Sequence, residues 1–157
     1  LDGAAIAKTS FGKGEQANVT ALATYVAAES RGMRFALPQS HPEEQRSYEI
    51  GKRVFFYRAG PYDFSCATCH GEPGKRIRLQ DLPELTKNPA DGVGFAAWPA
   101  YRVSSGELWG MQRRLNDCYR QQRFPYPGYG SDVTIALASY MGINAKGAES
   151  IAPSIKR

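Results

Sequence analysis

Apolar residues recur at helical spacing in several stretches of the chain, and segments rich in Gly and Pro separate these stretches. Residues 33–42 are expected to form a connector, and residues 71–106 a long loop with short helical pieces. The spacing predicts helices over residues 18–32, 43 to about 58, about 106 to 123, and 131 or 132 to about 147. The pattern therefore predicts an all-α fold with long irregular loops.

Small and polar residues mark where these helices begin, end and approach one another. Asn18 is placed to cap the first helix and Gly32 to terminate it, while Ser131 or Asp132 would cap the last. The second helix has an aromatic-rich face, and Gly51 lies within it. Because glycine has no side chain, we expect another helix to approach closely at this position.

The strongest chemical signal is the run Cys66-Ala67-Thr68-Cys69-His70, which follows the second predicted helix. Cys-x-x-Cys-His is the attachment motif of a c-type haem. Two thiols on one helical turn can each form a thioether bond to a haem vinyl group, and the adjacent imidazole then binds one axial face of the iron. The motif predicts one covalent haem c, attached through Cys66 and Cys69 and ligated by His70.

Other uses of a Cys-x-x-Cys pair fit the chain less well. A redox-active pair is typical of a βαβ context, and no such pattern surrounds the motif. A zinc site would need two further ligands at matched spacing, whereas the chain has only one other cysteine and one other histidine. Haem attachment is the preferred interpretation, and it predicts a cytochrome c fold whose long loops wrap the haem.

Length and charge limit the classes of function. A chain of 157 residues, 42% of them hydrophobic, supports one domain with a real core. The net charge of +5 favours anionic partners or substrates. The Lys and Arg residues are dispersed, however, and no nucleic-acid-binding motif occurs. No apolar run approaches the length of a membrane span, so we expect neither a nucleic-acid partner nor a membrane span.

Covalent haem attachment predicts maturation outside the bacterial cytoplasm, and hence a protein of the periplasm. The sequence starts at Leu1 and shows no signal peptide, so it is expected to be processed or truncated. One cysteine, Cys118, is left over after the haem takes two. An odd cysteine in an exported protein requires an explanation.

The first and last predicted helices resemble each other. Residues 133–141 repeat residues 19–26 after one inserted residue, and a basic residue and a glycine follow each helix. In a small cytochrome, the helix after the haem loop closes the fold against the helix before the motif. Residues 1–40 are therefore expected to carry the closing helix of a preceding cytochrome-like domain, and residues 41–157 to form a haem c domain. Chance similarity between two amphipathic helices is the alternative.

The group that faces the iron opposite His70 decides the chemistry. A methionine would make an electron carrier, because a thioether raises the potential of the iron, and Met111 lies in the right part of the chain. Met111 and Met141 both lie in apolar helical patterns, however, where a methionine is more often a core residue than a ligand. The candidates are Met33, Met111, Met141, His41, Cys118, a water molecule, or no ligand.

Cys118 is the sharper candidate because the stretch of residues 113–120 around it contains three arginines. Arg114 precedes it by one helical turn, so the two side chains share a face. Cationic neighbours lower a thiol pKa and make the thiolate available as a nucleophile or a metal ligand. The alternative is a buried structural cysteine, and the neighbouring Asp117 and Tyr119 are expected to be solvated.

The order of these motifs resembles the haem domain of the SoxA family, the catalytic subunits of the SoxAX thiosulfate-oxidising cytochromes. The haem motif alone is common, but its combination with a downstream Arg-Arg-x-x-x-Cys run is specific. The resemblance spans about residues 18–142. Its matching segments are 65–70, 74–78, 99–102, 113–118 and 127–132, together with the helix at 18–32 and Met33.

The resemblance implies that Cys118 is the distal haem ligand, carried as a persulfide, and that Arg114 is the neighbouring active-site arginine. It implies an L-cysteine S-thiosulfotransferase that joins thiosulfate oxidatively to a cysteine of the carrier protein SoxYZ and passes electrons to a SoxX-type cytochrome c subunit. Arginine suits sulfonate oxygens, and a thiolate or persulfide suits exchange at sulfur.

Two other functions stay open. One is a plain periplasmic electron-transfer cytochrome c with His70 and Met111 as ligands. The other is a redox or ligand sensor in which Cys118 binds the iron and exchanges with small molecules.

Overall fold

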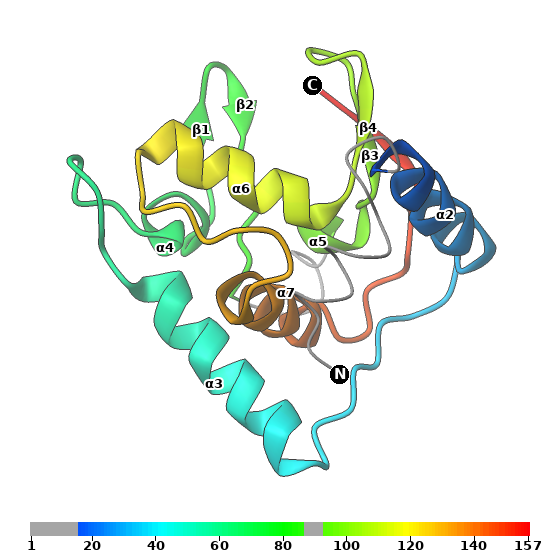
Figure 1. Ribbon diagram of the computed structural model, residues 1–157, viewed down its shortest axis with the longest axis horizontal. Coiled ribbons are helices and arrows are strands. Elements are labelled where there is room, and N and C mark those ends of the chain that lie inside the picture. Colours follow the sequence, from blue (N-terminus) through cyan, green and yellow to red (C-terminus); the bar gives the residue numbers. More distant parts are fainter. Residues whose placement is uncertain (1–15, 87–92) are drawn as a thin grey trace.

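Two helices, α3 (Pro42–Phe56) and α7 (Asp132–Asn144), pack against each other at the centre of the fold. The structure, a computed structural model, describes residues 16–86 and 93–157. In Figure 1, α6 (Met111–Gln122) lies above α7, and the short helix α4 (Cys66–His70) lies beside the end of α3. This arrangement brings the Cys-x-x-Cys-His motif and the helix of Cys118 to the same end of the α3–α7 pair.

The close approach of α3 to α7 depends on Gly51. A Cβ atom placed there would collide with the carbonyl group of Ala136 and lie 2.8 Å from the Cβ atom of Tyr140. The ring of Tyr140 packs in turn against Phe55 of α3, with 5.1 Å between ring centroids. The predicted close contact at Gly51 is therefore confirmed, and α7 is the partner helix.

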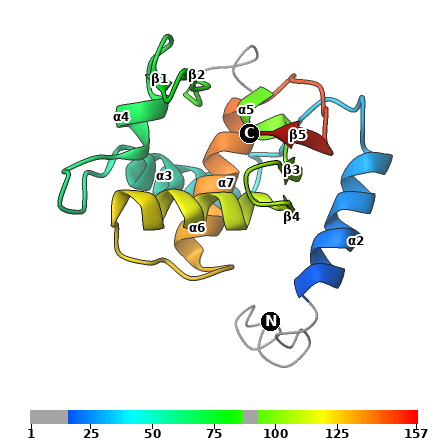
Figure 2. The same cartoon turned by 90° about the horizontal axis from the view of Figure 1, so that it is seen from above.

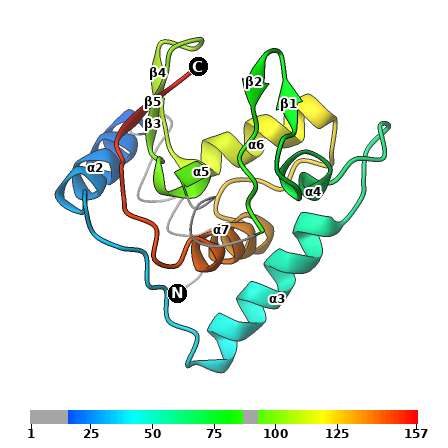
Figure 3. The same cartoon turned by 180° about the vertical axis from the view of Figure 1, so that it is seen from behind.

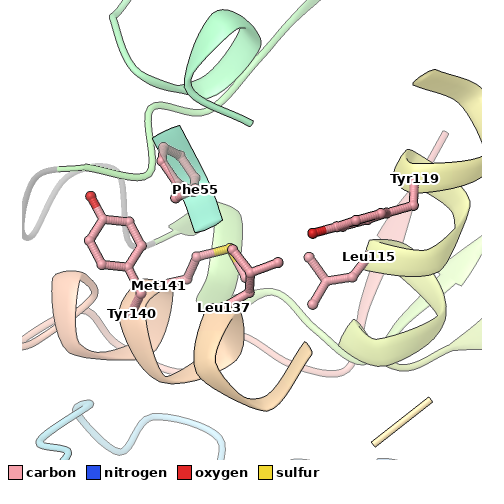
Figure 4. Close-up of a cluster of buried hydrophobic side chains, with 6 residues drawn as sticks. All are labelled: Phe55, Leu115, Tyr119, Leu137, Tyr140 and Met141. Atoms are coloured by element: carbon pink, nitrogen blue, oxygen red, sulfur yellow. The ribbon is translucent and has the colours of Figure 1, made fainter. Parts of the chain in front are cut away.

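A cluster of buried side chains from α3, α6 and α7 forms the main core. Figure 4 shows that the side chains of Leu115 and Tyr119 extend from α6 toward those of Leu137 and Met141 on α7. Aromatic and aliphatic side chains of this size supply most of the free energy of burial in a domain of this length. The cluster consists of Phe55, Leu115, Tyr119, Leu137, Tyr140 and Met141.

Two small sheets accompany the helices. β1 (Arg76–Ile77) and β2 (Gln80–Asp81) form an antiparallel hairpin after the haem motif. β3 (Ala100–Arg102) is the middle strand of a second sheet, antiparallel to β4 (Glu107–Trp109) and parallel to β5 (Ser154–Lys156). The described chain is thus mainly helical, as predicted, but the all-α prediction missed both sheets.

The long segment after the motif contains one further short helix, α5 (Val93–Ala96). The prediction that the third long helix starts near residue 106 is wrong, because residues 107–109 form β4 and the helix starts at Met111. Gly106 has a φ of +67° in the turn between β3 and β4. Leu108 fits the helical spacing, but in the structure it pairs with Tyr101 across the β3–β4 ladder.

Helix α2 (Gln16–Glu29) lies beside the sheet of strands β4, β3 and β5 and away from α3, as Figures 2 and 3 show. It begins before Asn18, so the prediction that Asn18 caps it is wrong. The predicted terminator Gly32 has a φ of +86°, in the region that favours glycine. The following residues pair with the chain after α7, through Arg34 and Glu149 among others.

The similar helices α2 and α7 differ in burial. Leu137 and Tyr140 of α7 are 0% and 3% exposed, whereas the matching Leu22 and Tyr25 of α2 are 63% and 64% exposed. The assignment of residues 1–40 to a preceding domain stays a prediction, and residues 1–15 lie outside the described residues. Within residues 16–86 and 93–157, no helix is both long enough and apolar enough to span a membrane.

We predict that Gly51→Ala destabilises the protein by about 1–3 kcal/mol or more, because its Cβ would overpack the α3–α7 contact. The free energy of unfolding of the holoprotein measures the effect. Lys52→Ala is the matched control, since Lys52 is the next residue of α3 and is exposed. Equal stability of the two variants would contradict the close approach.

Candidate functional site

The motif helix α4 forms because both of its ends are capped. The Ser65 hydroxyl accepts a hydrogen bond from the Thr68 amide at 3.2 Å, and the Thr68 hydroxyl accepts one from the Ser65 amide at 2.9 Å. At the other end, the Gly71 amide donates to the Ala67 carbonyl at 2.8 Å. This reciprocal capping box lets a helix of only five residues form, and it fixes the relative positions of the motif residues.

The two cysteines and the histidine of the motif line one cavity of about 280 Å³. Cys66, Cys69 and His70 follow each other at helical i, i+3 and i+4 spacing, so they share a face of α4. Much of the remaining wall is apolar and belongs to the core, with Phe55 and Leu137 among the lining residues. An apolar cavity with a few convergent polar groups is the usual form of a cofactor site.

The ring of His70 is held by the segment that follows the motif. Its Nδ1 lies 2.8 Å from the Pro83 carbonyl oxygen. A carbonyl oxygen only accepts hydrogen bonds, so Nδ1 carries the proton and Nε2 keeps its lone pair. Axial histidines are commonly oriented in this way by a second hydrogen bond.

The same segment is tied to the core on its other side. The Leu85 amide donates to the His70 carbonyl at 2.9 Å, and the Leu85 carbonyl accepts from the Asn144 side chain on α7 at 3.0 Å. Burial lowers the pKa of His70, and the charge of Arg114 lowers it further. The imidazole is therefore kept neutral, which is the form that binds a metal.

Helix α6 brings Cys118, the predicted distal ligand, and its predicted neighbour Arg114 to this cavity. Cys118 and Arg114 line it together with the motif residues. Arg114 donates to the Asp117 carboxylate at 3.2 Å, and Asp117 also accepts from Arg120 at 2.7 Å and from Gln121 at 2.6 Å. The cavity thus joins a sulfur atom, a fixed guanidinium and the haem-attachment motif.

Two neighbours of Cys118 differ from expectation. Asp117 and Tyr119 were predicted to be solvated, yet the Asp117 side chain is only 10% exposed and Tyr119 is part of the buried core. Asp117 is buried because three donors satisfy its carboxylate, which offsets the loss of solvent. Helical periodicity could have placed Tyr119 inside, since it lies four residues after the apolar Leu115.

Burial dominates the electrostatics of the thiols. It raises the pKa of Cys118, although the charges of Arg114 and Arg102 act in the opposite direction. The charges of the arginines thus lower this pKa as expected, but burial outweighs them, so the pKa of Cys118 lies above its ordinary value. Burial also raises the pKa of Cys66 to about 12, and the nearby Cys118 adds to the shift.

The other distal candidates fall into two groups. Met111 and Met141 line the cavity beside Cys118, and Met141 is also part of the buried core. Met33 is exposed, and His41 caps α3 by accepting a hydrogen bond from the Glu43 amide at 3.2 Å. Neither Met33 nor His41 is among the residues that line the cavity in the described part of the chain.

Three basic residues that were not selected as site residues from the sequence line the cavity, namely Arg102, Lys156 and Arg157. Arg102 on β3 and Lys156 on β5 face each other in the parallel strand pair, and both border the cavity. Arg102 ends the segment 99–102 that resembles the SoxA family, but its place at the cavity depends on the sheet that the helical pattern did not predict. The site is therefore more basic than the α6 segment alone suggested.

The residues present fit a covalent haem c. Two thiols and one imidazole on a single capped helix match the donor set of that group, and apolar walls suit a porphyrin. Cys66 and Cys69 would hold the haem covalently, His70 would bind one axial face, and Cys118 or Met111 would supply the opposite ligand.

Comparison with known proteins gives consistent matches. The chain is 54% identical over 145 residues to the L-cysteine S-thiosulfotransferase subunit SoxA of Hydrogenophilus thermoluteolus, covering 92% of this chain and 53% of that protein. It is 40% identical over 141 residues to a subunit of the same name from Hydrogenobacter thermophilus, covering 89% and 53%. No family model matches the chain.

A solved structure matches as well. The crystal structure of SoxXA from P. pantotrophus superposes with a TM-score of 0.80 at 25% identity, covering 98% of this chain and 56% of the matched one. The chain thus spans about half the length of the relatives it matches.

We predict that Cys66→Ala combined with Cys69→Ala abolishes covalent haem attachment, because no thiol of the motif remains. Intact mass under denaturing conditions should show the wild-type protein with one haem and the double variant without it. Cys118→Ser is the control and should keep the haem mass. Covalent haem in the double variant would contradict the assignment.

Asp117→Asn should lower the free energy of unfolding of the holoprotein by about 1–3 kcal/mol, because the buried carboxylate accepts from three donors. Chemical denaturation measures the loss. Glu49→Gln, which neutralises an exposed carboxylate on α3, should change stability by less than about 0.5 kcal/mol. Similar losses in both variants would argue against a structural role for Asp117.

Proposed function

Because the chain belongs to the SoxA family over the residues it spans, we propose that it forms the haem-bearing part of an L-cysteine S-thiosulfotransferase. The reaction joins thiosulfate to a cysteine of a carrier protein of the SoxYZ type. A bond forms between the sulfane sulfur of thiosulfate and the Sγ atom of the carrier cysteine. The carrier thiol loses its proton, and two electrons leave the sulfur atoms.

The observation that carries this proposal is the shared cavity of the haem motif, Cys118 and Arg114. An oxidative coupling of two sulfur compounds needs an electron acceptor, a sulfur-reactive group and a binding site for a dianion. The motif residues would hold the electron acceptor, Cys118 is the sulfur-reactive group, and Arg114 binds the dianion. Their meeting in one cavity is specific, because they come from two helices that are distant in the sequence.

Each side chain then has a distinct task. Arg114 binds sulfonate oxygens of thiosulfate through its planar guanidinium, and Asp117 holds that guanidinium in position. Cys118 presents its sulfur atom toward the sulfane sulfur of the bound anion. When bound, the haem supplies the one-electron acceptor through which the two electrons leave. The apolar wall around Phe55 and Leu137 limits the entry of water.

The accompanying features follow from the same residues. We propose one haem c per chain in a cytochrome c fold, which Cys66 and Cys69 would hold covalently and whose iron His70 and Cys118 would bind. Because such haems are attached outside the bacterial cytoplasm, we propose a periplasmic location. The electrons would pass to a SoxX-type cytochrome c subunit, and the superposition with a SoxXA structure supports such a partner.

A second function is supported by one observation. Met111 lines the same cavity as Cys118, so a His70–Met111 pair could ligate the iron and make the chain an electron carrier. The two functions predict different distal ligands, which electron paramagnetic resonance distinguishes.

We predict that Cys118→Ser lowers thiosulfate-dependent reduction of the cytochrome partner by at least about 10³-fold, as for loss of a reactive side chain. The haem content should be unchanged, because Cys66 and Cys69 attach the haem. The ferric wild-type protein should give a low-spin thiolate-type signal that the variant lacks.

Met111→Leu is the matched control and should keep both the activity and the signal. If the wild-type protein has no thiosulfate-dependent activity, and Met111→Leu loses the low-spin signal while Cys118→Ser keeps it, the chain is an electron carrier instead.

A further inference from the structure

Arg102 has a buried donor without a partner in the described part of the chain. Its Nε atom is inaccessible to solvent and makes no hydrogen bond there. The rest of the guanidinium makes a long contact of 3.4 Å to the Ser104 hydroxyl and lies 5.4 Å from the centre of the Trp109 ring. Buried donors are normally satisfied, so an unpaired one requires an explanation such as a ligand.

The carboxylate on the strand opposite Arg102 is already engaged by other side chains. Glu107 lies opposite Arg102 in the β3–β4 ladder, which would suit an ion pair across the strands. Its carboxylate instead binds Arg113 and accepts from the Trp109 indole at 3.3 Å. Among residues 16–86 and 93–157, no carboxylate forms an ion pair with Arg102.

The other charges around the cavity leave a positive excess. The carboxylate of Asp117 already binds Arg114, Arg120 and Gln121. Asp81, which also lines the cavity, forms an ion pair with Arg76 at 2.9 Å. The cationic groups of the lining are Arg102, Arg114, Lys156 and Arg157. A partly buried cavity with this imbalance attracts anions.

Arg102 borders the cavity that is also lined by Cys118 and Arg114. Burial lowers its pKa, and the charge of Arg114 lowers it further, whereas Asp117 and Cys118 raise it. The charge of Arg102 in turn lowers the pKa of the Cys118 thiol. Arg102 and Arg114 line the same cavity as Cys118 and reach it from different elements, Arg102 from β3 and Arg114 from α6.

We propose that Arg102 is a second anion-binding residue of the site, and that it binds the sulfonate oxygens of the substrate together with Arg114. This inference rests on the proposed function. Two guanidinium groups match the two charges of thiosulfate, and both border the cavity in which the anion would bind. Arg102 then governs the affinity for the sulfur oxyanion, while Cys118 carries the chemistry.

The carboxylates of haem propionates have the same affinity for guanidinium groups as a sulfonate, so the test separates the two anions. Arg102→Gln and Arg102→Lys are made in the holoprotein, assembled with its cytochrome partner. Arg53→Gln is the matched control, because it removes the same charge from an exposed position on α3 that does not line the cavity. Three quantities are measured: thiosulfate affinity by calorimetry, kcat and KM for thiosulfate, and haem content with its midpoint potential.

We expect Arg102→Gln to weaken thiosulfate binding by about 10- to 100-fold, the effect of losing a charge-assisted hydrogen bond. The KM should rise more than the kcat falls, and haem content and potential should not change. Arg102→Lys should recover part of the affinity, because the charge remains without the planar fork. Arg53→Gln should leave all three quantities unchanged.

Unchanged thiosulfate affinity in Arg102→Gln would overturn the inference. Unchanged affinity with lost haem or a shifted potential would overturn it in favour of a propionate contact. If the wild-type protein binds thiosulfate through Arg102 without turning it over, the proposed function fails while the anion site stands. The two ideas are therefore tested separately.

Discussion

The contact between α3 and α7 at Gly51 is the constraint on which the site depends. It lets the two helix backbones approach closely, and each helix then positions one part of the cavity. The end of α3 supports the motif helix α4, and α7 holds the following segment through Asn144 and packs against α6. A wider spacing between α3 and α7 would shift His70 relative to Cys118.

The chemistry of the cavity results from a balance between burial and charge. Burial raises the pKa values of Cys66 and Cys118, which favours the protonated form of these two thiols. The arginines oppose that effect, and the carboxylates nearby are engaged with other donors. Such a site has little affinity for cations and a marked affinity for anions, which agrees with the net charge of the chain.

Local chemistry made some of this structure predictable from the sequence. The haem motif, the approach of another helix at Gly51, and the pairing of Arg114 with Cys118 all depend on spacing within one helix, which periodicity records. The role of Arg102 could not be found in this way, because it follows from β3 lying between β4 and β5. A strand of three residues is too short to show the alternating pattern of apolar and polar residues that predicts a strand. Leu108 also fitted the helical spacing.

The burial of Asp117 was likewise hidden, since a carboxylate is ordinarily exposed unless partners from tertiary structure satisfy it. The wrong start of α6 has the same origin. The helical spacing of apolar residues starts near Gly106, but the chain turns at this residue, and the next residues form β4, which pairs with β3. Errors thus concentrate where contacts between distant segments override local preference.

The separation of α3 and α7 in the sequence also bears on how the protein folds. The chain between them contains the motif, both hairpins and α6, so their contact closes a long loop. Closing such a loop costs entropy before the contact is made, which delays non-local pairs relative to local ones. Local interactions such as the cap of α4 form earlier, and the motif thiols are then still accessible. The order of folding thus leaves a period in which a haem can be attached before α7 completes the cavity around it.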